Sequence, residues 1–87
     1  MWHLYLIRTR MGHLYTGVTQ DVKRRFKEHT EGGAKAAKFL KGKEPLNLVF
    51  HQEIGSRSLA LKMEAAIKKW SKGKKESLVK KEISLVI

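Results

Sequence analysis

Two tyrosines, an arginine, a histidine and a glutamate are the residues of this chain whose types and spacing could support chemistry. Tyr5 and Tyr15 are ten residues apart, and Arg25 follows after ten more. Each has an ordinary interpretation when it is taken singly, because aromatic residues in strands are mostly packing residues and surface arginines are mostly solvated. Their meaning therefore depends on the groups that the fold brings beside them.

Glu64 is the most informative of these residues, because it is the only acidic residue between Ile54 and Lys75. A carboxylate on a phosphate-binding surface repels its ligand unless a cation lies between them. Mg²⁺ commonly uses one or two carboxylates together with phosphate oxygens and water, which makes Glu64 a candidate metal ligand. The alternative is an ion pair between Glu64 and Lys68 at i, i+4, which is worth only about 0.2–0.5 kcal/mol. Both interpretations stay open at this point.

Arg25 and His29 are four residues apart on the helix expected after Asp21, so their side chains project from the same side. That side borders the predicted buried face, which carries Val22 and Phe26. A guanidinium in this position suits bidentate binding of a phosphate. His29 can equally be a histidine near the end of a helix that interacts with the helix dipole.

The charge of the chain favours a polyanionic partner. Nineteen Lys and Arg against eight Asp and Glu give a formal net charge of +11 in 87 residues. Neutralisation of phosphates by basic side chains supplies most of the sequence-independent affinity for nucleic acid, so nucleic acid is the expected partner. A membrane surface is disfavoured because the aromatic residues are needed for the core.

With no cysteine, no membrane-spanning stretch and no visible signal peptide, the chain is expected to be cytoplasmic.

Three strands are expected from the hydrophobic pattern, and a turn joins the first two into a hairpin. The strands cover residues 2–8, 13–18 and 46–54, and the turn covers residues 9–12. In the third strand, alternation predicts Leu46, Leu48 and Phe50 on the same face.

Three helices are expected as well. The first follows an Asp21 N-cap and runs to about residue 30, the second follows Ser56, and Gly73 is expected to separate it from a last helix at about 74–82. The predicted buried stripe of the second helix consists of Leu59, Met63, Ala66, Ile67 and Trp70.

Two segments are less regular. Residues 34–43 are expected to form a short helix or an ordered loop, and the apolar residues 83–87 a terminal strand or a docked tail. The order ββα(α)βαα predicts an α/β protein of the α+β kind, with a three-stranded antiparallel sheet flanked by helices. The length suits one domain over residues 1–87.

The ordered motifs of the chain resemble those of the GIY-YIG nuclease family. The first motif is represented by residues 3–5 (HLY) and the second by residues 14–17 (LYTG). The helix signature corresponds to residues 21–29, and the glutamate of the catalytic helix falls on Glu64. The resemblance covers residues 2–80 and is closest to the short, single-domain bacterial members. These are related to the nuclease domain of eukaryotic branched-DNA resolving enzymes.

The resemblance implies a metal-dependent phosphodiester hydrolase with one divalent ion, Mg²⁺ or Mn²⁺. Glu64 would hold the metal, Arg25 would clamp the scissile phosphate, and Tyr5 would position or deprotonate the attacking water. Tyr15 would orient Tyr5 or the phosphate, and His29 would hydrogen-bond near the water. Whether Tyr5 or His29 is the base stays open. Six basic residues are expected to contact nucleic acid: Lys35, Lys38, Lys41, Lys43, Arg57 and Lys68.

The main functional prediction is therefore an endonuclease that acts on DNA in preference to RNA, with branched or flapped DNA as candidate substrates, in DNA repair or recombination. The alternative is a nucleic-acid-binding module that kept the fold and the charge but lost efficient hydrolysis, or that needs a protein partner. A third hypothesis is an RNA- or ribosome-associated protein. The oligomeric state and the preferred nucleic-acid structure are not predicted.

Overall fold

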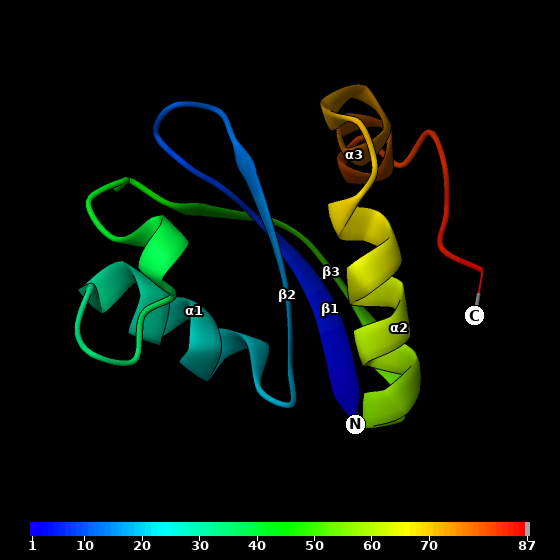
Figure 1. The fold of residues 1–87 in the computed structure, drawn as a ribbon, viewed down its shortest axis with the longest axis horizontal. Coiled ribbons are helices and arrows are strands. Elements are labelled where there is room, and N and C mark those ends of the chain that lie inside the picture. The colour runs from blue at the N-terminus through cyan, green and yellow to red at the C-terminus, as the bar shows by residue number, and fades with distance from the viewer. Residues whose placement is uncertain (87) are drawn as a thin grey trace.

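The computed structural model describes residues 1–86, which form an α+β fold with a three-stranded antiparallel sheet (Figure 1). The predicted fold class and strand number are confirmed. The elements in chain order are β1 (Trp2–Arg8), β2 (Leu14–Thr19), α1 (Val22–Glu31), the 3₁₀ helix η1 (Lys38–Leu40), β3 (Asn47–Gly55), α2 (Arg57–Lys68) and α3 (Lys72–Val79).

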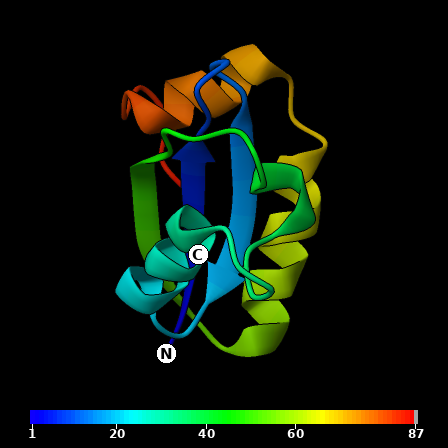
Figure 2. The same ribbon diagram turned by 90° about the vertical axis from the view of Figure 1, so that its left-hand side faces the viewer.

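The first strand lies in the centre of the sheet, whose order is β2-β1-β3. Its alternating side chains divide the core into two parts, because successive residues of a strand point to opposite faces. Leu4 and Leu6 pack on one face with residues of α2 and α3, whereas Tyr5 and Ile7 pack on the other with residues of α1 and η1. Figure 2 shows α1 in front of the sheet, with α2 at the side of β2. The second strand is an edge strand, so groups from both faces can meet along it.

A β-bulge changes the face of one predicted core residue. The register between β1 and β3 shifts between Leu6, which pairs with Phe50, and Ile7, which pairs with Leu48. An extra residue in β3 therefore reverses the alternation at this point. Leu48 packs with the cluster under α1, but Phe50 packs with the cluster under α2. The prediction that both share one face is wrong, because a bulge is not visible in the pattern of residue types.

The buried face of α2 also differs from the prediction. Ala66 is exposed, whereas Ala60 is fully buried and Met63 and Ile67 lie on the same side as predicted. Leu59 and Trp70 also pack against this cluster as predicted, so Ala66 is the one wrong residue and Ala60 is buried in its place. Glu64 lies at the margin of this face, as expected, and is half-buried.

The division between α2 and α3 does not depend on Gly73, which lies inside α3. The break comes from Ser71, whose backbone is extended and whose side chain accepts a hydrogen bond from the N–H of Lys74. An N-cap of this kind starts a helix without any need for a preceding glycine. The last helix therefore begins at Lys72 and ends at Val79, earlier at both ends than predicted.

Two alternatives were expected for each of the two less regular segments, and the structure agrees with one of them in each case. Residues 34–43 form an ordered loop that contains the single 3₁₀ turn of η1. Ile83 and Leu85 pack, partly buried, against the cluster under α2, so the tail is docked through these two side chains, whereas Val86 is exposed and residue 87 lies outside the described residues. No helix in the described part of the chain is long and apolar enough to cross a membrane.

An ion pair joins β1 to α3. Arg8, at the end of β1, donates two hydrogen bonds to the carboxylate of Glu76, and the Nη2–Oε1 distance is 2.8 Å. The ammonium of Lys72 also lies 3.2 Å from Oε2 of Glu76. The hydrogen bonds from Arg8, helped by Lys72 and opposed by desolvation, lower the pKa of Glu76 to about 2. The pair therefore stabilises the fold only while Glu76 is ionised.

This pair predicts a pH-dependent contribution to stability. Because the folded pKa of about 2 lies below the ordinary value of 4.5, the contribution is complete above pH 4.5 and is lost as the pH falls through about 2. Glu76→Gln is expected to lower the free energy of unfolding by about 1 kcal/mol at neutral pH, measured by urea denaturation, with a difference that shrinks over this range. Glu82→Gln, at an exposed position, is the control. A difference that does not depend on pH would contradict the assignment.

Candidate active site

Tyr5 lies against a glycine of the neighbouring strand. The two residues Tyr5 and Gly17 are Cα partners in the β1–β2 pairing, and the side chain of Tyr5 is 2% exposed. A Cβ atom placed on Gly17 would lie 2.5 Å from Cζ of Tyr5, far inside van der Waals contact, and it would overlap the phenol oxygen as well. The phenol can therefore occupy this position only because residue 17 has no side chain. In the sequence, Gly17 stands out only as part of the LYTG motif, and no local pattern predicts this role.

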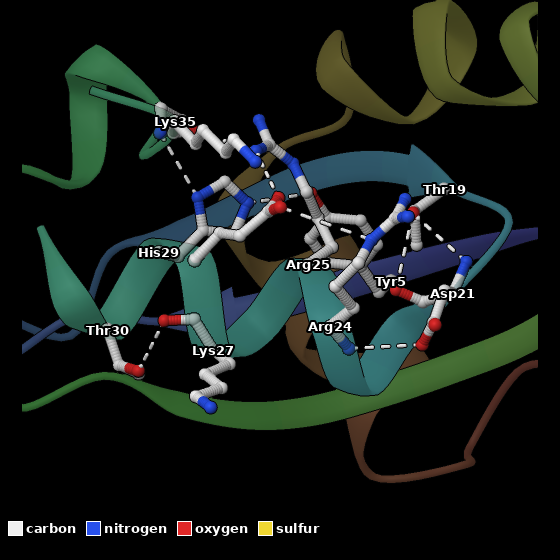
Figure 3. A network of polar contacts seen from close by, with 11 residues as sticks. Tyr5, Thr19, Asp21, Arg24, Arg25, Lys27, His29, Thr30 and Lys35 are labelled. Atoms are coloured by element: carbon white, nitrogen blue, oxygen red, sulfur yellow. Dashed lines mark hydrogen bonds and ion pairs between the residues drawn. The ribbon is translucent and has the colours of Figure 1, made fainter. Parts of the chain in front are cut away.

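His29 is held between the sheet and the loop that follows α1. Its Nε2 lies 2.9 Å from the Tyr5 hydroxyl, and the backbone N–H of Ala37 donates to its Nδ1 over 3.1 Å (Figure 3). A neutral imidazole carries one hydrogen, and a nitrogen that accepts a hydrogen bond cannot hold it. The hydrogen is therefore on Nε2, and His29 donates it to the oxygen of Tyr5. The phenol oxygen of Tyr5 is therefore the acceptor of this buried hydrogen bond.

Burial moves the pKa values of this pair in opposite directions. Desolvation is the largest of the effects that lower the pKa of His29 to about 4. The positive charge of Arg25 lowers this pKa further, and the negative charge of Glu28 opposes the shift. Desolvation raises the pKa of Tyr5 to about 12, and the effects of Tyr15 and Glu64 add to it while Arg25 opposes it. At neutral pH the pair therefore consists of a neutral imidazole and a neutral phenol.

Arg25 is fixed in place by two contacts of one nitrogen. Its Nη1 donates to Oε1 of Glu28 over 3.0 Å and also to the backbone carbonyl of Lys35. The guanidinium is 28% exposed, so it is partly open to solvent, and it acts on the pKa values of both Tyr5 and His29. Figure 3 shows Arg25 beside Tyr5, on the same helix as His29. The predicted proximity of these three residues is present in the structure.

Glu64 lies on the helix that covers the other face of the sheet. It lies on α2, which contacts the edge strand β2, and its negative charge contributes to the raised pKa of Tyr5. Its side chain is 19% exposed, and Oε2 lies 3.5 Å from the ammonium of Lys68. The ion pair expected from the i, i+4 spacing is thus present. It does not conflict with a place near Tyr5, because a pair of this type is weak.

The donor set around Glu64 decides what kind of metal site is possible here. No group of three or more His, Asp or Glu residues within residues 1–86 could enclose a metal ion. One carboxylate fits Mg²⁺ or Mn²⁺ only where water and phosphate oxygens supply the other ligands, which is a common arrangement for Mg²⁺. The residues present therefore fit a divalent ion that is bound together with a phosphate, and Glu64 would hold it.

Tyr15 belongs to a cluster of aromatic rings on the same side as Tyr5. Its ring centroid lies 6.4 Å from that of Tyr5, 5.7 Å from that of His29 and 5.9 Å from that of Phe39. Tyr15 is half-buried, so it forms one wall of the group and not part of its interior. Phe39 was not predicted to lie near the site. The only signal for it in the sequence was a single aromatic residue among four lysines.

The predicted nucleic-acid contacts lie on both sides of this group. Lys35, Lys38, Lys41 and Lys43 lie on the loop that contains η1, and all of them except Lys43 are exposed. Lys68 is one turn from Glu64, whereas Arg57 begins α2 and lies over the ring of Trp2, 5.8 Å from its centroid. Four of the six positions therefore lie on the loop that follows α1, and the other two, Arg57 and Lys68, lie on α2 with Glu64.

Known proteins resemble this chain in sequence over most of its length. The model of the GIY-YIG catalytic domain matches residues 1–77. The UPF0213 protein of Yersinia pestis (strain Pestoides F) is 57% identical over 79 residues, which are 91% of this chain and 81% of that protein.

Two solution NMR structures are similar to the fold. The UPF0213 protein BH0048 from Bacillus halodurans is 38% identical, with a TM-score of 0.58, and the match covers 92% of this chain and 84% of that one. The protein EF2693 from E. faecalis is 31% identical, with a TM-score of 0.60, over 98% of this chain and 90% of that one.

The contact between Tyr5 and Gly17 leads to a first prediction for the site. Gly17→Ala is expected to lower the free energy of unfolding by about 1–3 kcal/mol, because its Cβ would displace the phenol. In a Tyr5→Leu background the same substitution should cost clearly less, since the ring is absent. Gly33→Ala is the matched control, because a Cβ there meets no heavy atom within 4 Å. Urea denaturation of the four combinations measures the coupling, and equal costs in both backgrounds would show that the clash is not the cause.

The tautomer of His29 leads to a second prediction. In ¹⁵N-detected NMR, the imidazole should carry its hydrogen on Nε2 at neutral pH and should titrate near pH 4. Because its folded pKa lies below the ordinary 6.5, His29 contributes stability that is complete above pH 6.5 and is lost as the pH falls from there through about 4. A hydrogen on Nδ1, or a midpoint near 6.5, would contradict the hydrogen bond from Ala37.

Proposed function

The chain belongs to the GIY-YIG catalytic domain family and to its short bacterial UPF0213 members, and we propose that it is a divalent-metal-dependent endonuclease that hydrolyses DNA phosphodiester bonds. The observation that carries the proposal is the buried hydrogen bond from His29 to Tyr5, with Arg25 beside it. Any buried phenol needs a hydrogen-bond partner, so the feature that packing alone does not require is the guanidinium of Arg25, which lies close enough to act on the pKa of Tyr5.

Tyr5 is the base of the proposed reaction. Its oxygen accepts a hydrogen bond from Nε2 of His29, and the positive charge of Arg25 lowers its pKa against the effect of burial. Both interactions become stronger when the phenol loses its proton, because a phenolate is a better acceptor and carries a charge. Tyr5 acts as the base in its phenolate form, after its own proton has passed to solvent. The phenolate oxygen then takes a proton from the water molecule that attacks the phosphorus atom, which returns Tyr5 to the neutral phenol while the bond from phosphorus to the leaving oxygen breaks.

His29 positions Tyr5 and does not act as the base. Both of its ring nitrogens are used inside the protein, and its pKa of about 4 makes it a poor proton acceptor at neutral pH. This proposal decides between the two bases that the sequence left open. Tyr15 forms the wall beside both residues and limits the orientations that Tyr5 can adopt.

Arg25 binds the scissile phosphate. Its Nη1 is held by Glu28 and by the carbonyl of Lys35, so the guanidinium is oriented before a substrate arrives. A positive group that does not have to reorganise stabilises the charge that develops on the phosphate oxygens as the bond to water forms.

Glu64 would hold the divalent ion, Mg²⁺ or Mn²⁺, and such an ion supplies positive charge to the phosphate and to the leaving oxygen. The raised pKa of Tyr5 has the negative charge of Glu64 as one of its causes. Any neutralisation of Glu64 therefore favours loss of the proton from Tyr5. The ammonium of Lys68, 3.5 Å away, partly has this effect in the absence of substrate.

The net charge of +11 and the lysines around η1 support a nucleic acid as the substrate, and the resemblance to branched-DNA resolving enzymes favours DNA. We propose that this whole chain is one cytoplasmic domain that acts on structured DNA in repair or recombination, in the manner of the branched-DNA resolving enzymes it resembles, with or without a protein partner.

A second candidate function is a nucleic-acid-binding module without efficient hydrolysis. It is favoured by the pKa of about 12 for Tyr5, which leaves very little phenolate at neutral pH, and by the pairing of Glu64 with Lys68. On this alternative, the same basic residues bind DNA and no metal produces cleavage. The logarithm of the binding constant falls linearly with the logarithm of the salt concentration.

Cleavage assays distinguish the two functions. With Mg²⁺ or Mn²⁺ and single-stranded, duplex, flap or four-way-junction DNA, Glu64→Gln is expected to lower the cleavage rate at least about 100-fold while binding is retained. Arg25→Ala should lower the rate by a similar factor. Its matched control is Arg24→Ala on the same helix, where the side chain is 65% exposed.

The control separates catalysis from simple charge. Arg24→Ala and Arg25→Ala remove the same charge, so both should reduce the dependence of affinity on salt by a similar amount. Cleavage that survives Glu64→Gln would contradict the endonuclease proposal. DNA binding without cleavage in either metal, together with equal effects of the two arginine substitutions on affinity, would favour the binding module.

A further inference from the structure

Phe39 is an exposed aromatic residue whose exposure the core does not explain. Five large apolar side chains are exposed among residues 1–86, and Phe39 is the one aromatic ring among them, at 44%. It lies in the middle of η1, between Lys38 and the fully buried Leu40. Leu40 anchors this short helix in the core, so η1 does not need Phe39 as a second anchor.

The surroundings of Phe39 are those of a stacking site for a charged ligand. Its ring is stacked on Tyr15, with a centroid distance of 5.9 Å and an angle of 23° between the planes. The ammonium of Lys43 lies 3.6 Å from the centroid of the same ring. Lys38 and Lys41, on either side of it in the chain, are exposed. Aromatic rings set among basic side chains are the combination that binds single-stranded nucleic acid.

The ring is also connected to the site described above. Tyr15, on which Phe39 stacks, has its ring centroid 6.4 Å from that of Tyr5. The residue that precedes η1, Ala37, donates the backbone hydrogen bond that fixes the tautomer of His29. The surface of Phe39 and the phenol of Tyr5 are therefore two ends of one aromatic cluster. Arg25 donates a hydrogen bond to the carbonyl of Lys35, so it contacts the same loop that carries Phe39.

We propose that Phe39, supported by Tyr15, is a stacking position for an unpaired nucleobase of DNA next to the phosphate that is cleaved. The inference rests on the proposed function and adds the class of substrate to it. Stacking of a base on an aromatic ring is stronger than an exposed cation–π contact, so a base displaces the ammonium of Lys43 from the ring. Lys43 is then free to contact a backbone phosphate, where its charge releases a counterion.

This position selects substrates that contain unpaired nucleotides. In a duplex each base is paired and stacked on its neighbours, so it reaches Phe39 only after it has been flipped out of the helix, at a considerable cost. Single strands, flaps and junctions offer such a base without this cost. The preference for branched DNA thus follows from a ring on η1 and needs no separate specificity domain.

The test measures binding without divalent metal, so that it does not depend on hydrolysis. A short single strand of DNA is prepared as a series in which one abasic site replaces each nucleotide in turn. With the wild-type protein, one position is expected to weaken the affinity about tenfold, and its neighbours much less. Phe39→Leu should lose this position dependence, whereas Phe39→Tyr, which keeps the ring, should retain it.

A second readout uses the wild-type protein alone and is independent of any effect of the substitutions on folding. 2-Aminopurine, whose fluorescence falls when it stacks, is placed at each position of the same strand. A fall on binding at the position found with the abasic series is the expected result. A uniform response along the strand, or a Phe39→Leu variant that keeps the position dependence, would overturn the stacking site.

The outcomes separate this inference from the proposed function. If Glu64-dependent cleavage occurs but flat profiles are found in both series, the stacking site is wrong and the nuclease stands. If the stacking position is present and no metal supports cleavage, the nuclease proposal is wrong. Phe39 would then bind a base in a nucleic-acid-binding module, which is the second candidate function. An RNA strand of the same sequence that binds tenfold more tightly than DNA would overturn the assignment to DNA.

Discussion

The hydrogen bond between His29 and Tyr5 is the interaction on which the rest of the candidate site depends. It joins α1 to the central strand of the sheet inside the protein, where an unpaired polar group is costly. Two further features make it possible. The N–H of Ala37 leaves only Nε2 of His29 as a donor, and the missing side chain of Gly17 leaves room for the phenol. Loss of any of these would leave a buried polar group without its partner or the ring without its place.

On the proposed function, the position of this pair explains how helices on opposite faces of the sheet would reach one phosphate. The phenol lies over Gly17 of β2, which is an edge strand, so its oxygen is near the border between the two faces. The helix α2 covers the other face and contacts β2, and Glu64 approaches from there (Figure 2). The two charged groups, Arg25 and Glu64, therefore lie on either side of a strand edge and not within an enclosed pocket. An open edge of this kind suits a polymer, which cannot enter a closed cavity.

Much of the fold could be predicted because strand alternation and helix caps are local. Asp21 and Ser56 start α1 and α2 as expected from the sequence. The features that were missed depend on contacts between distant residues. The bulge that turns Phe50 toward α2 is a property of the pairing between two strands, and the cap at Ser71 replaced the break expected at Gly73.

The same distinction applies to the candidate site. The proximity of Arg25 and His29 followed from their spacing on one helix, but the roles of Gly17 and Phe39 did not follow from spacing. A glycine in a strand carries no sign of which ring lies over it, and a phenylalanine between lysines does not reveal that Tyr15 stacks on it. The proximity of Glu64 to Tyr5 was expected only from resemblance, since no local pattern relates a helix to the far face of a sheet.

The central claim is that Glu64 and Tyr5 belong to one metal-dependent site at the edge of β2. Paramagnetic broadening by Mn²⁺ tests it directly, in ¹⁵N-labelled protein bound to a short DNA strand. The account predicts that amide signals around Glu64 in α2 and around Gly17 in β2 broaden first, and that Glu64→Gln abolishes this effect. Broadening that is centred on another part of the chain, or that persists unchanged in Glu64→Gln, would contradict it.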